Sequence, residues 1–270
     1  MPDRIVPDSA IEEKGKKRAR AYCRLGDNYL RANLLDDAIV AFTKAAQCDP
    51  EYSRSHNNLG IIYAELGKFP EAIEAYKNAI LIDPGNALHY CNLGGAYADA
   101  GKAEIALEAY LAAIQVDPNY YFGYFTLGTY YQSHSKHALA LENFKKSIEL
   151  KPNFAQGYVN IGMMYHNLSK TKPLSWRKRD QLVCFDCSAK VAQALAAFTM
   201  ALELDPQCES AYYQLGIMYK EMVHYDEAIR AFKKLLSLND KSENAELAKS
   251  YIDEMQKRTK AQRYNNPEVL

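Results

Sequence analysis

Two hydrophobic patterns alternate along most of the chain, and each has the spacing of one face of a helix. The first surrounds a Leu-Gly or Ile-Gly pair, with an aromatic residue or His four positions before the glycine and a Tyr three positions after it. Residues spaced in this way share one helical face, so each pattern predicts an amphipathic helix. The glycines are Gly26, Gly60, Gly94, Gly128, Gly162 and Gly216.

The second pattern follows each of these helices. It begins with Ala and places an aromatic residue four positions later, which again is the spacing of one helical face. The pairs are Ala38/Phe42, Ala72/Tyr76, Ala106/Tyr110, Ala140/Phe144, Ala194/Phe198 and Ala228/Phe232. A proline then closes every unit except the last, and proline stops a helix. The chain is therefore predicted to be a series of helix pairs.

The glycines recur at a fixed interval. From Gly26 to Gly162 each step is 34 residues, whereas the step to Gly216 is 54. A glycine inside a helix costs about 1 kcal/mol relative to alanine, so close packing of the paired helices must offset that cost. A single pair cannot bury enough surface, and stacking on the next pair completes each core.

These motifs resemble the tetratricopeptide-repeat family, whose signature places an aromatic residue, Leu-Gly, Tyr, Ala, Phe, Ala and Pro at fixed offsets. The resemblance implies an all-α, right-handed superhelical solenoid of six helix pairs with a C-terminal capping helix. We expect an N-terminal extension at 1–18, six repeats over 19–240, a capping helix at 241–260 and a tail at 261–270. The repeats are expected at 19–52, 53–86, 87–120, 121–154, 155–208 and 209–240, with an insertion at about 169–188 in the fifth.

The resemblance also implies that the first helices of successive repeats line a concave groove that binds an extended peptide. The slot two residues before each glycine holds mostly amides, which can donate and accept hydrogen bonds together. After Arg24, this slot holds Asn58, Asn92, Thr126, Asn160 and Gln214. The row is similar to the asparagine ladder in the repeats of the O-linked N-acetylglucosamine transferase. An alternative is that these amides form local hydrogen bonds near the next helix.

Four residues before that slot, the first two repeats carry Arg20 and Arg54 and a later repeat carries Phe122. With Phe125, the predicted groove has a cationic start and an aromatic middle suited to a partner's apolar anchors. Alternatively, the two Phe side chains pack against the next repeat. A clamp for a C-terminal carboxylate is not expected, because Cys23 and Leu88 stand where such a clamp needs Lys.

The fifth repeat contains about twenty extra residues between its two helices, and they carry a basic excess. Trp176, Arg177, Lys178 and Arg179 lie within this insertion and form a candidate arm for an acidic partner. The alternative is a tolerated loop, since surface insertions cost little. The second helix of this repeat is expected to be extended at its start.

The balance of charged residues bears on which classes of partner the chain could bind. The chain has 33 basic and 33 acidic residues among 270, and a neutral chain disfavours a dedicated nucleic-acid binder, which needs a basic excess. Nucleic-acid binding through the insertion and the basic run at 15–20 is kept as an alternative, as is recruitment to a larger enzyme complex. No secretory signal or membrane span is evident, so a cytoplasmic location is expected.

Catalytic motifs are not found, so the chain is not expected to be an enzyme or to use a cofactor. Cys184 and Cys187 are the only closely paired thiols, but a zinc site normally needs four ligands and no second pair exists. They are weak metal candidates. The sequence thus predicts a scaffold or chaperone-like adaptor that binds other proteins.

Overall fold

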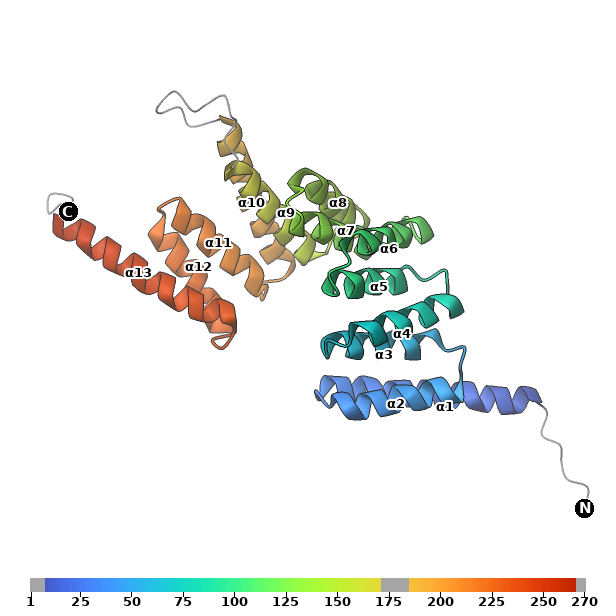
Figure 1. Cartoon of the computed structure of the whole chain (residues 1–270). Helices are drawn as coiled ribbons and strands as arrows, with labels where there is room; N and C mark the ends of the chain where they lie inside the picture. The colour runs from blue at the N-terminus through green and yellow to red at the C-terminus, as the bar shows by residue number, and fades with distance from the viewer. Residues whose placement is uncertain (1–7, 171–184, 266–270) are drawn as a thin grey trace, which may run out of the picture. The chain divides into compact units, whose positions relative to one another are not determined.

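The computed structural model describes residues 8–170 and 185–265, and within them the chain forms only α-helices (Figure 1). This confirms the predicted all-α solenoid class. The helices are α1 (Asp8–Arg31), α2 (Leu35–Cys48), α3 (Ser53–Glu65), α4 (Phe69–Ile82), α5 (Ala87–Asp99), α6 (Ala103–Val116), α7 (Tyr121–Ser133), α8 (His137–Leu150), α9 (Ala155–Lys170), α10 (Phe185–Leu204), α11 (Glu209–Glu221), α12 (Tyr225–Leu238) and α13 (Glu243–Asn265).

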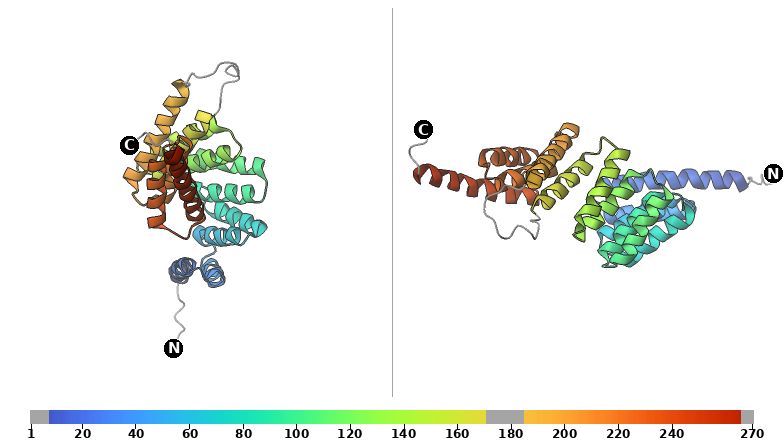
Figure 2. Two further views of the ribbon diagram at one scale, coloured as in Figure 1. Left: turned by 90° about the vertical axis from the view of Figure 1, so that its left-hand side faces the viewer. Right: turned by 90° about the horizontal axis from the view of Figure 1, so that it is seen from above.

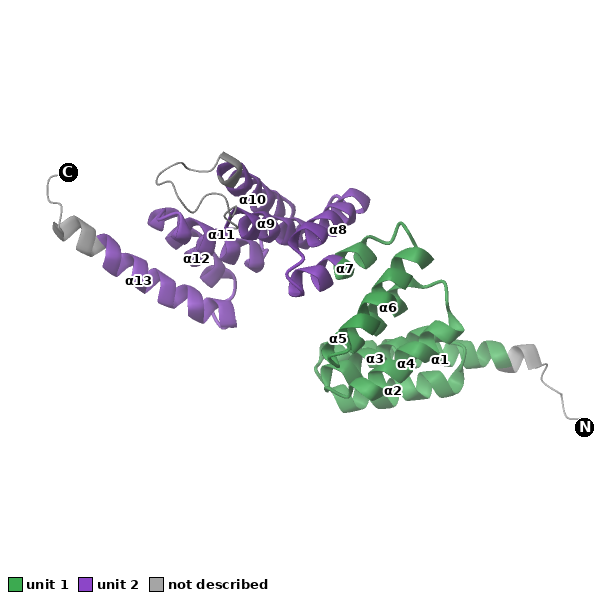
Figure 3. Cartoon of the chain, turned by 45° about the horizontal axis from the view of Figure 1, so that its top comes forward, with its two compact units in different colours: residues 1–127 green, residues 128–270 purple. Residues whose placement is uncertain are grey.

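The helices fall into two compact units, 1–127 and 128–270, with the boundary inside α7 (Figure 3). In unit 1, α1 packs on α2, α3 on α4 and α5 on α6, and α2 and α4 each contact the helix that follows. In unit 2, α9 packs on α10 and α11 on α12, while α13 packs on α12.

Each pair closes where the glycine of the first helix meets the aromatic residue of the second. A Cβ atom added at Gly26 would lie 2.7 Å from the ring of Phe42, and one added at Gly60 would lie 2.6 Å from the ring of Tyr76. In both pairs the ring lies over the glycine, and Ala38 and Ala72, four residues before the rings, are fully buried.

The turn between the paired helices uses one left-handed residue per repeat. Gly67 and Gly101 take this conformation, with φ of 69° and 74°. The same turn position carries non-glycine residues in three other repeats, with φ between 57° and 63°: Asn33, Ser135 and Val223. A left-handed conformation is rare for a β-branched residue, so Val223 is strained.

The fifth repeat departs from this turn. Ser169 occupies the turn position 34 residues after Ser135, yet α9 continues through it to Lys170. Its partner α10 has 20 residues, whereas α2, α4 and α12 have 14, as expected for a second helix lengthened at its start. The connecting residues 171–184 lie outside the described part of the chain, and with them the predicted arm, namely Trp176, Arg177, Lys178 and Arg179.

At each end of the chain a helix runs across a predicted boundary. Helix α1 begins at Asp8, so it crosses the expected border at 18/19 and extends past α2 (Figure 2). Gly15 allows this, because a Cβ there would lie 2.6 Å from the carbonyl oxygen of Cys48 at the end of α2. At the other end, α13 runs beyond residue 260. Ser242 Oγ accepts the backbone N–H of Ala245 at 3.2 Å and so caps this helix.

Candidate functional site

In unit 1, the first helices of successive repeats are linked by the side chains two residues before each repeat glycine. Asn92 Nδ2 donates to Asn57 Oδ1 at 2.8 Å, which links α5 to α3. Asn58 Nδ2 lies 3.8 Å from Cys23 Sγ on α1, and Thr126 Oγ1 lies 3.6 Å from the sulfur of the equivalent cysteine, Cys91, on α5. All three contacts span 35 residues, so each slot bonds the residue before the slot in the preceding repeat. These side chains therefore form local hydrogen bonds, and the partner lies on the preceding first helix.

Asp27 is a junction that the sequence did not reveal. It follows Gly26 on α1, and its two carboxylate oxygens accept hydrogen bonds from different residues of α3. Arg54 Nη2 donates to Oδ2 at 2.6 Å, and Asn58 Nδ2 donates to Oδ1 at 3.1 Å. The Asn58 side chain is consequently buried, with 8% of its surface exposed. Both predicted groove residues are thus held by one carboxylate.

A buried polar cluster follows between α3 and α5. Asn57 Oδ1 accepts from Asn92 and also lies 3.1 Å from Nδ1 of His89, which is 2% exposed. His89 Nε2 is buried without a hydrogen-bond partner. Burial lowers the pKa of His89, and the opposing effect of Asp83 is smaller. The equivalent slot elsewhere holds small residues: Ala21, Ser55, Gly123, Gly157 and Ala211.

The exposed face of α1 carries several basic side chains. Arg20 and Arg24 are exposed, and neither forms an ion pair with another described residue. Lys17 is paired with Glu13 one turn earlier, at 2.7 Å. We use the name first-helix strip for the slot residues and their partners four positions earlier in unit 1, together with Phe125. Its members are Arg20, Arg24, Arg54, Asn58, Leu88, Asn92, Phe122, Phe125 and Thr126.

The last part of the strip is aromatic. Phe122 and Phe125 stack with ring centroids 5.7 Å apart and an interplanar angle of 24°. Phe122 packs against Ala87, Cys91 and Ala113 of the preceding repeat. Both Phe side chains remain half-buried, so each keeps part of its surface exposed. Phe122 therefore packs on the preceding repeat while both rings keep part of their surface exposed.

The two predicted groove residues after Thr126 belong to unit 2. Asn160 is 7% exposed, and its Oδ1 accepts from Gln156 Nε2 at 3.1 Å. Ser210 on α11 donates to Gln156 Oε1 at 3.2 Å, which connects α9 and α11. Gln214 is half-buried on α11. These residues form a separate polar row within their own unit.

A charged contact also holds α9 to α11. His166 Nε2 lies 3.0 Å from Glu221 Oε2, and Lys170 donates to Glu221 Oε1 at 2.8 Å. Burial, together with the charge of Lys170, lowers the pKa of His166 despite the nearby carboxylate. Burial tends to raise the pKa of Glu221, but the hydrogen bonds from Lys170 and His166 outweigh it and the pKa is lowered. The lengthened α9 thus stabilises its neighbour.

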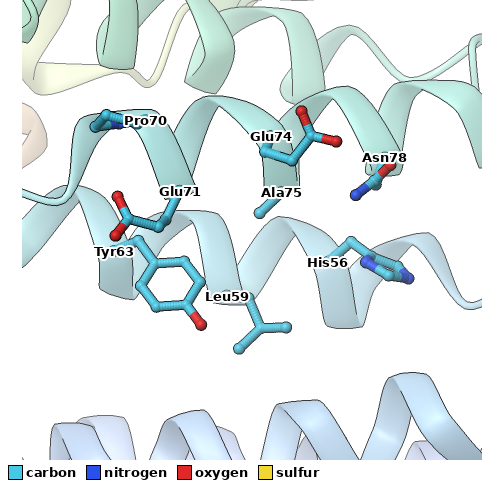
Figure 4. A pocket seen from close by; sticks show the side chains of 8 residues that line it. All are labelled: His56, Leu59, Tyr63, Pro70, Glu71, Glu74, Ala75 and Asn78. Carbon is cyan, nitrogen blue, oxygen red and sulfur yellow. The ribbon is translucent and has the colours of Figure 1, made fainter.

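A shallow groove of about 440 Å³ lies between α3 and α4, away from the strip (Figure 4). His56 occupies the position that holds Tyr in the other repeats, where for example Tyr22 lies beneath Lys44 at 5.9 Å. The shorter side chains of His56 and Asn78 leave this space open. Its lining is His56, Leu59, Tyr63, Pro70, Glu71, Glu74, Ala75 and Asn78.

The cysteines and possible metal ligands were also located in the structure. Cys23 and Cys91 are buried, and burial raises the pKa of each thiol to about 11. Of the predicted metal candidates, Cys184 and the side chain of Cys187 lie outside the described residues. Within the part of the chain that the structure describes, no three His, Cys, Asp or Glu side chains gather closely enough to hold a metal ion. In the same part, no helix has the length and apolar character needed to span a membrane.

Comparison with known proteins agrees with this geometry. A family model described as TPR repeat matches residues 60–101, and models described as tetratricopeptide repeat match 41–74 and four further ranges: 19–52, 90–120, 123–154 and 209–242. Together these matches cover more than half of the chain. No curated protein sequence matches it.

Several solved structures share the fold. The structure from the functional characterization of Pseudomonas aeruginosa pilF is 20% identical, with a TM-score of 0.65 over 88% of this chain and 99% of that one. PilW, a type IV pilus biogenesis factor, gives 16% and 0.65 over 85% and 97%. The Cut9–Hcn1 structure gives 19% and 0.69 over 92% of this chain but 45% of that one. At such identities the likeness shows the fold alone.

Proposed function

The chain belongs to the tetratricopeptide-repeat family, and we propose that it is a protein-interaction scaffold whose first-helix strip binds an extended segment of a partner. Repeats of this family stack into extended surfaces that contact other proteins. Binding here is noncovalent and needs no catalytic group. The cytoplasmic location remains a prediction.

The observation that carries the proposal is the edge-to-edge hydrogen bonding of α1, α3, α5 and the start of α7. Because each slot residue bonds the helix before it, four repeats present their exposed faces without a gap. An extended chain that crosses these helices would meet one repeat after another.

Within the strip, Asn92 and Thr126 are the residues best suited to bond a peptide backbone. Both are half-buried, so part of each side chain is accessible. Asn92 uses its Nδ2 on Asn57, which leaves its Oδ1 to accept a peptide N–H. Asn58 differs, because its amide is occupied by Asp27, Cys23 and Asn57. We therefore propose that Asn58 supports the strip while Asn92 contacts the ligand.

Photo-crosslinking tests this proposal. Peptides that bind the purified protein are first selected from a random library, and a benzophenone amino acid is then placed at Asn92. The matched control places it at Lys77, which is exposed on the second helix α4 of the same unit. We expect crosslinks to the selected peptides from position 92 and not from position 77. Crosslinks from 77 alone, or no bound peptide at all, would refute binding along the strip.

A further inference from the structure

We propose that the first-helix strip selects a ligand with two separated anchors, an acidic group over α1 and α3 and a large apolar side chain over the start of α7. This inference rests on the proposed function and adds the chemistry of the partner. It commits to an internal acidic segment of another protein, since the clamp residues for a C-terminal carboxylate are missing.

The acidic anchor follows from the charges on the strip. Arg20 and Arg24 are exposed without an ion-pair partner among the described residues, and they lie one turn apart on the same face of α1. Arg54 extends the cationic face to α3. Its charge is shared with Asp27, whose carboxylate is already satisfied by Arg54 and Asn58. Guanidinium groups bind carboxylates through two parallel hydrogen bonds, so this face suits Asp or Glu.

Two acidic side chains on the helices of the strip lie away from its cationic start. Glu65 and Asp99 are exposed at the far ends of α3 and α5. Arg54 and Glu65 are eleven residues apart on one helix, which is about 16 Å at 1.5 Å per residue. That distance exceeds the screening length of roughly 8 Å at physiological salt. The cationic start of the strip is therefore electrostatically separate from these carboxylates.

The apolar anchor follows from the other end. Phe122 packs on Ala87, Cys91 and Ala113 and stacks with Phe125, and both rings remain partly exposed. Leu88 is half-buried on the neighbouring α5 and holds the slot equivalent to Phe122. A rigid, partly exposed aromatic pair beside an aliphatic side chain is the kind of surface that receives an apolar hot-spot residue.

The distance between the anchors sets the spacing in the ligand. The path from α1 to α7 crosses three helix-to-helix steps of roughly 8–10 Å each, or about 24–30 Å. An extended chain covers roughly 3.3 Å per residue, so the acidic and apolar residues should be about seven to nine positions apart. A shorter ligand can occupy only one anchor.

Designed peptides test the inference by fluorescence anisotropy. Each carries a Glu pair, a Ser/Thr spacer and a Phe, in both chain directions, with spacers that place the anchors three or eight positions apart. We expect the eight-position peptide in one direction to bind ~10-fold tighter than the three-position peptide, and also ~10-fold tighter than the same peptide with Lys in place of Glu. Equal affinities for all of these peptides would overturn the inference.

A charge reversal provides the matched variant. Arg20→Glu with Arg24→Glu should reverse the preference, so that the Lys peptide binds tighter than the Glu peptide. Lys77→Glu with Lys102→Glu, on the second-helix side of the same unit, should leave the preference unchanged. If peptides still crosslink from Asn92 while the Arg20/Arg24 variant keeps its preference for Glu, the strip binds segments but the two-anchor chemistry is wrong. If no peptide crosslinks from that position, the proposed function itself fails.

Discussion

Asn58 reaches from the second repeat to Asp27 of the first, with 3.1 Å between its Nδ2 and the carboxylate Oδ1. The same carboxylate holds Arg54 through its other oxygen at 2.6 Å. Three polar side chains thereby link α3 to α1 through hydrogen bonds. Arg54 remains largely exposed in this arrangement.

The first prediction concerns this junction. Asn58→Ala should lower the free energy of unfolding by about 1–2 kcal/mol, because the half-buried Asp27 carboxylate loses a hydrogen-bond donor. Urea denaturation followed by circular dichroism measures the change. Asn119→Ala, at an exposed loop position, is the matched control and should have no effect beyond about 0.5 kcal/mol. A variant at position 58 that is as stable as the control would show that this hydrogen bond does not hold the repeats together.

The second prediction concerns the glycine under the ring. Gly60→Ala should destabilise the chain by about 1–2 kcal/mol, because the added Cβ would lie 2.6 Å from the ring of Tyr76 and overpacking outweighs the gain in helix propensity. Gly95→Ala, in α5, meets nothing closer than 3.9 Å and should instead stabilise by up to about 1 kcal/mol. The two variants therefore differ in sign. Stabilisation by both would mean that the helix pair does not close on its glycine.

The third prediction concerns the turn before α12. Val223 has φ of 63° and is 58% exposed, so it pays the left-handed strain without gaining burial. Val223→Gly should raise the free energy of unfolding by about 1 kcal/mol. The reciprocal change, Gly101→Val, places the same side chain in an equivalent turn with φ of 74° and should lower it. Thermal unfolding midpoints of the two variants should move in opposite directions.

The fourth prediction concerns the loss of folding stability at low pH. The pKa of His89 is lowered in the folded protein, so the unfolded chain binds more protons and stability falls as pH drops through about 6.5 toward the folded value. His89→Gln should remove part of this loss. The measurement is the difference in unfolding free energy between pH 7.5 and pH 5.5. His134→Gln, at an exposed position, should retain the full loss, and an equal loss in all three proteins would exclude His89 as a source.

The repeat period predicted the helices well because it depends only on neighbours in sequence. Helices α3, α5, α7, α9 and α11 begin at Ser53, Ala87, Tyr121, Ala155 and Glu209, where the repeats were expected to begin. In α13, Ala248, Ile252 and Met255 are buried where this helix packs on α12. Local spacing and packing agree at these positions.

The site was harder to predict, because it depends on how adjacent repeats are offset. Asp27 meets Arg54 and Asn58 across intervals of 27 and 31 residues, which do not appear in a period of 34. The equivalent slot holds Ile61 and Gly95 in the next two repeats, so no pattern marks Asp27 as polar. The unpaired Nε2 of His89 could not be predicted either, because its burial depends on how the neighbouring repeats pack.

We propose that unit 1 binds a partner along the first-helix strip. The side-chain amide resonances of its Asn residues test this binding most directly. The measurement is a ¹H–¹⁵N spectrum of the protein titrated with its tightest selected peptide. We predict that the side-chain amide of Asn92 shifts, while that of Asn78, in the groove between α3 and α4, does not. Shifts at Asn78 with no change at Asn92 would contradict the account.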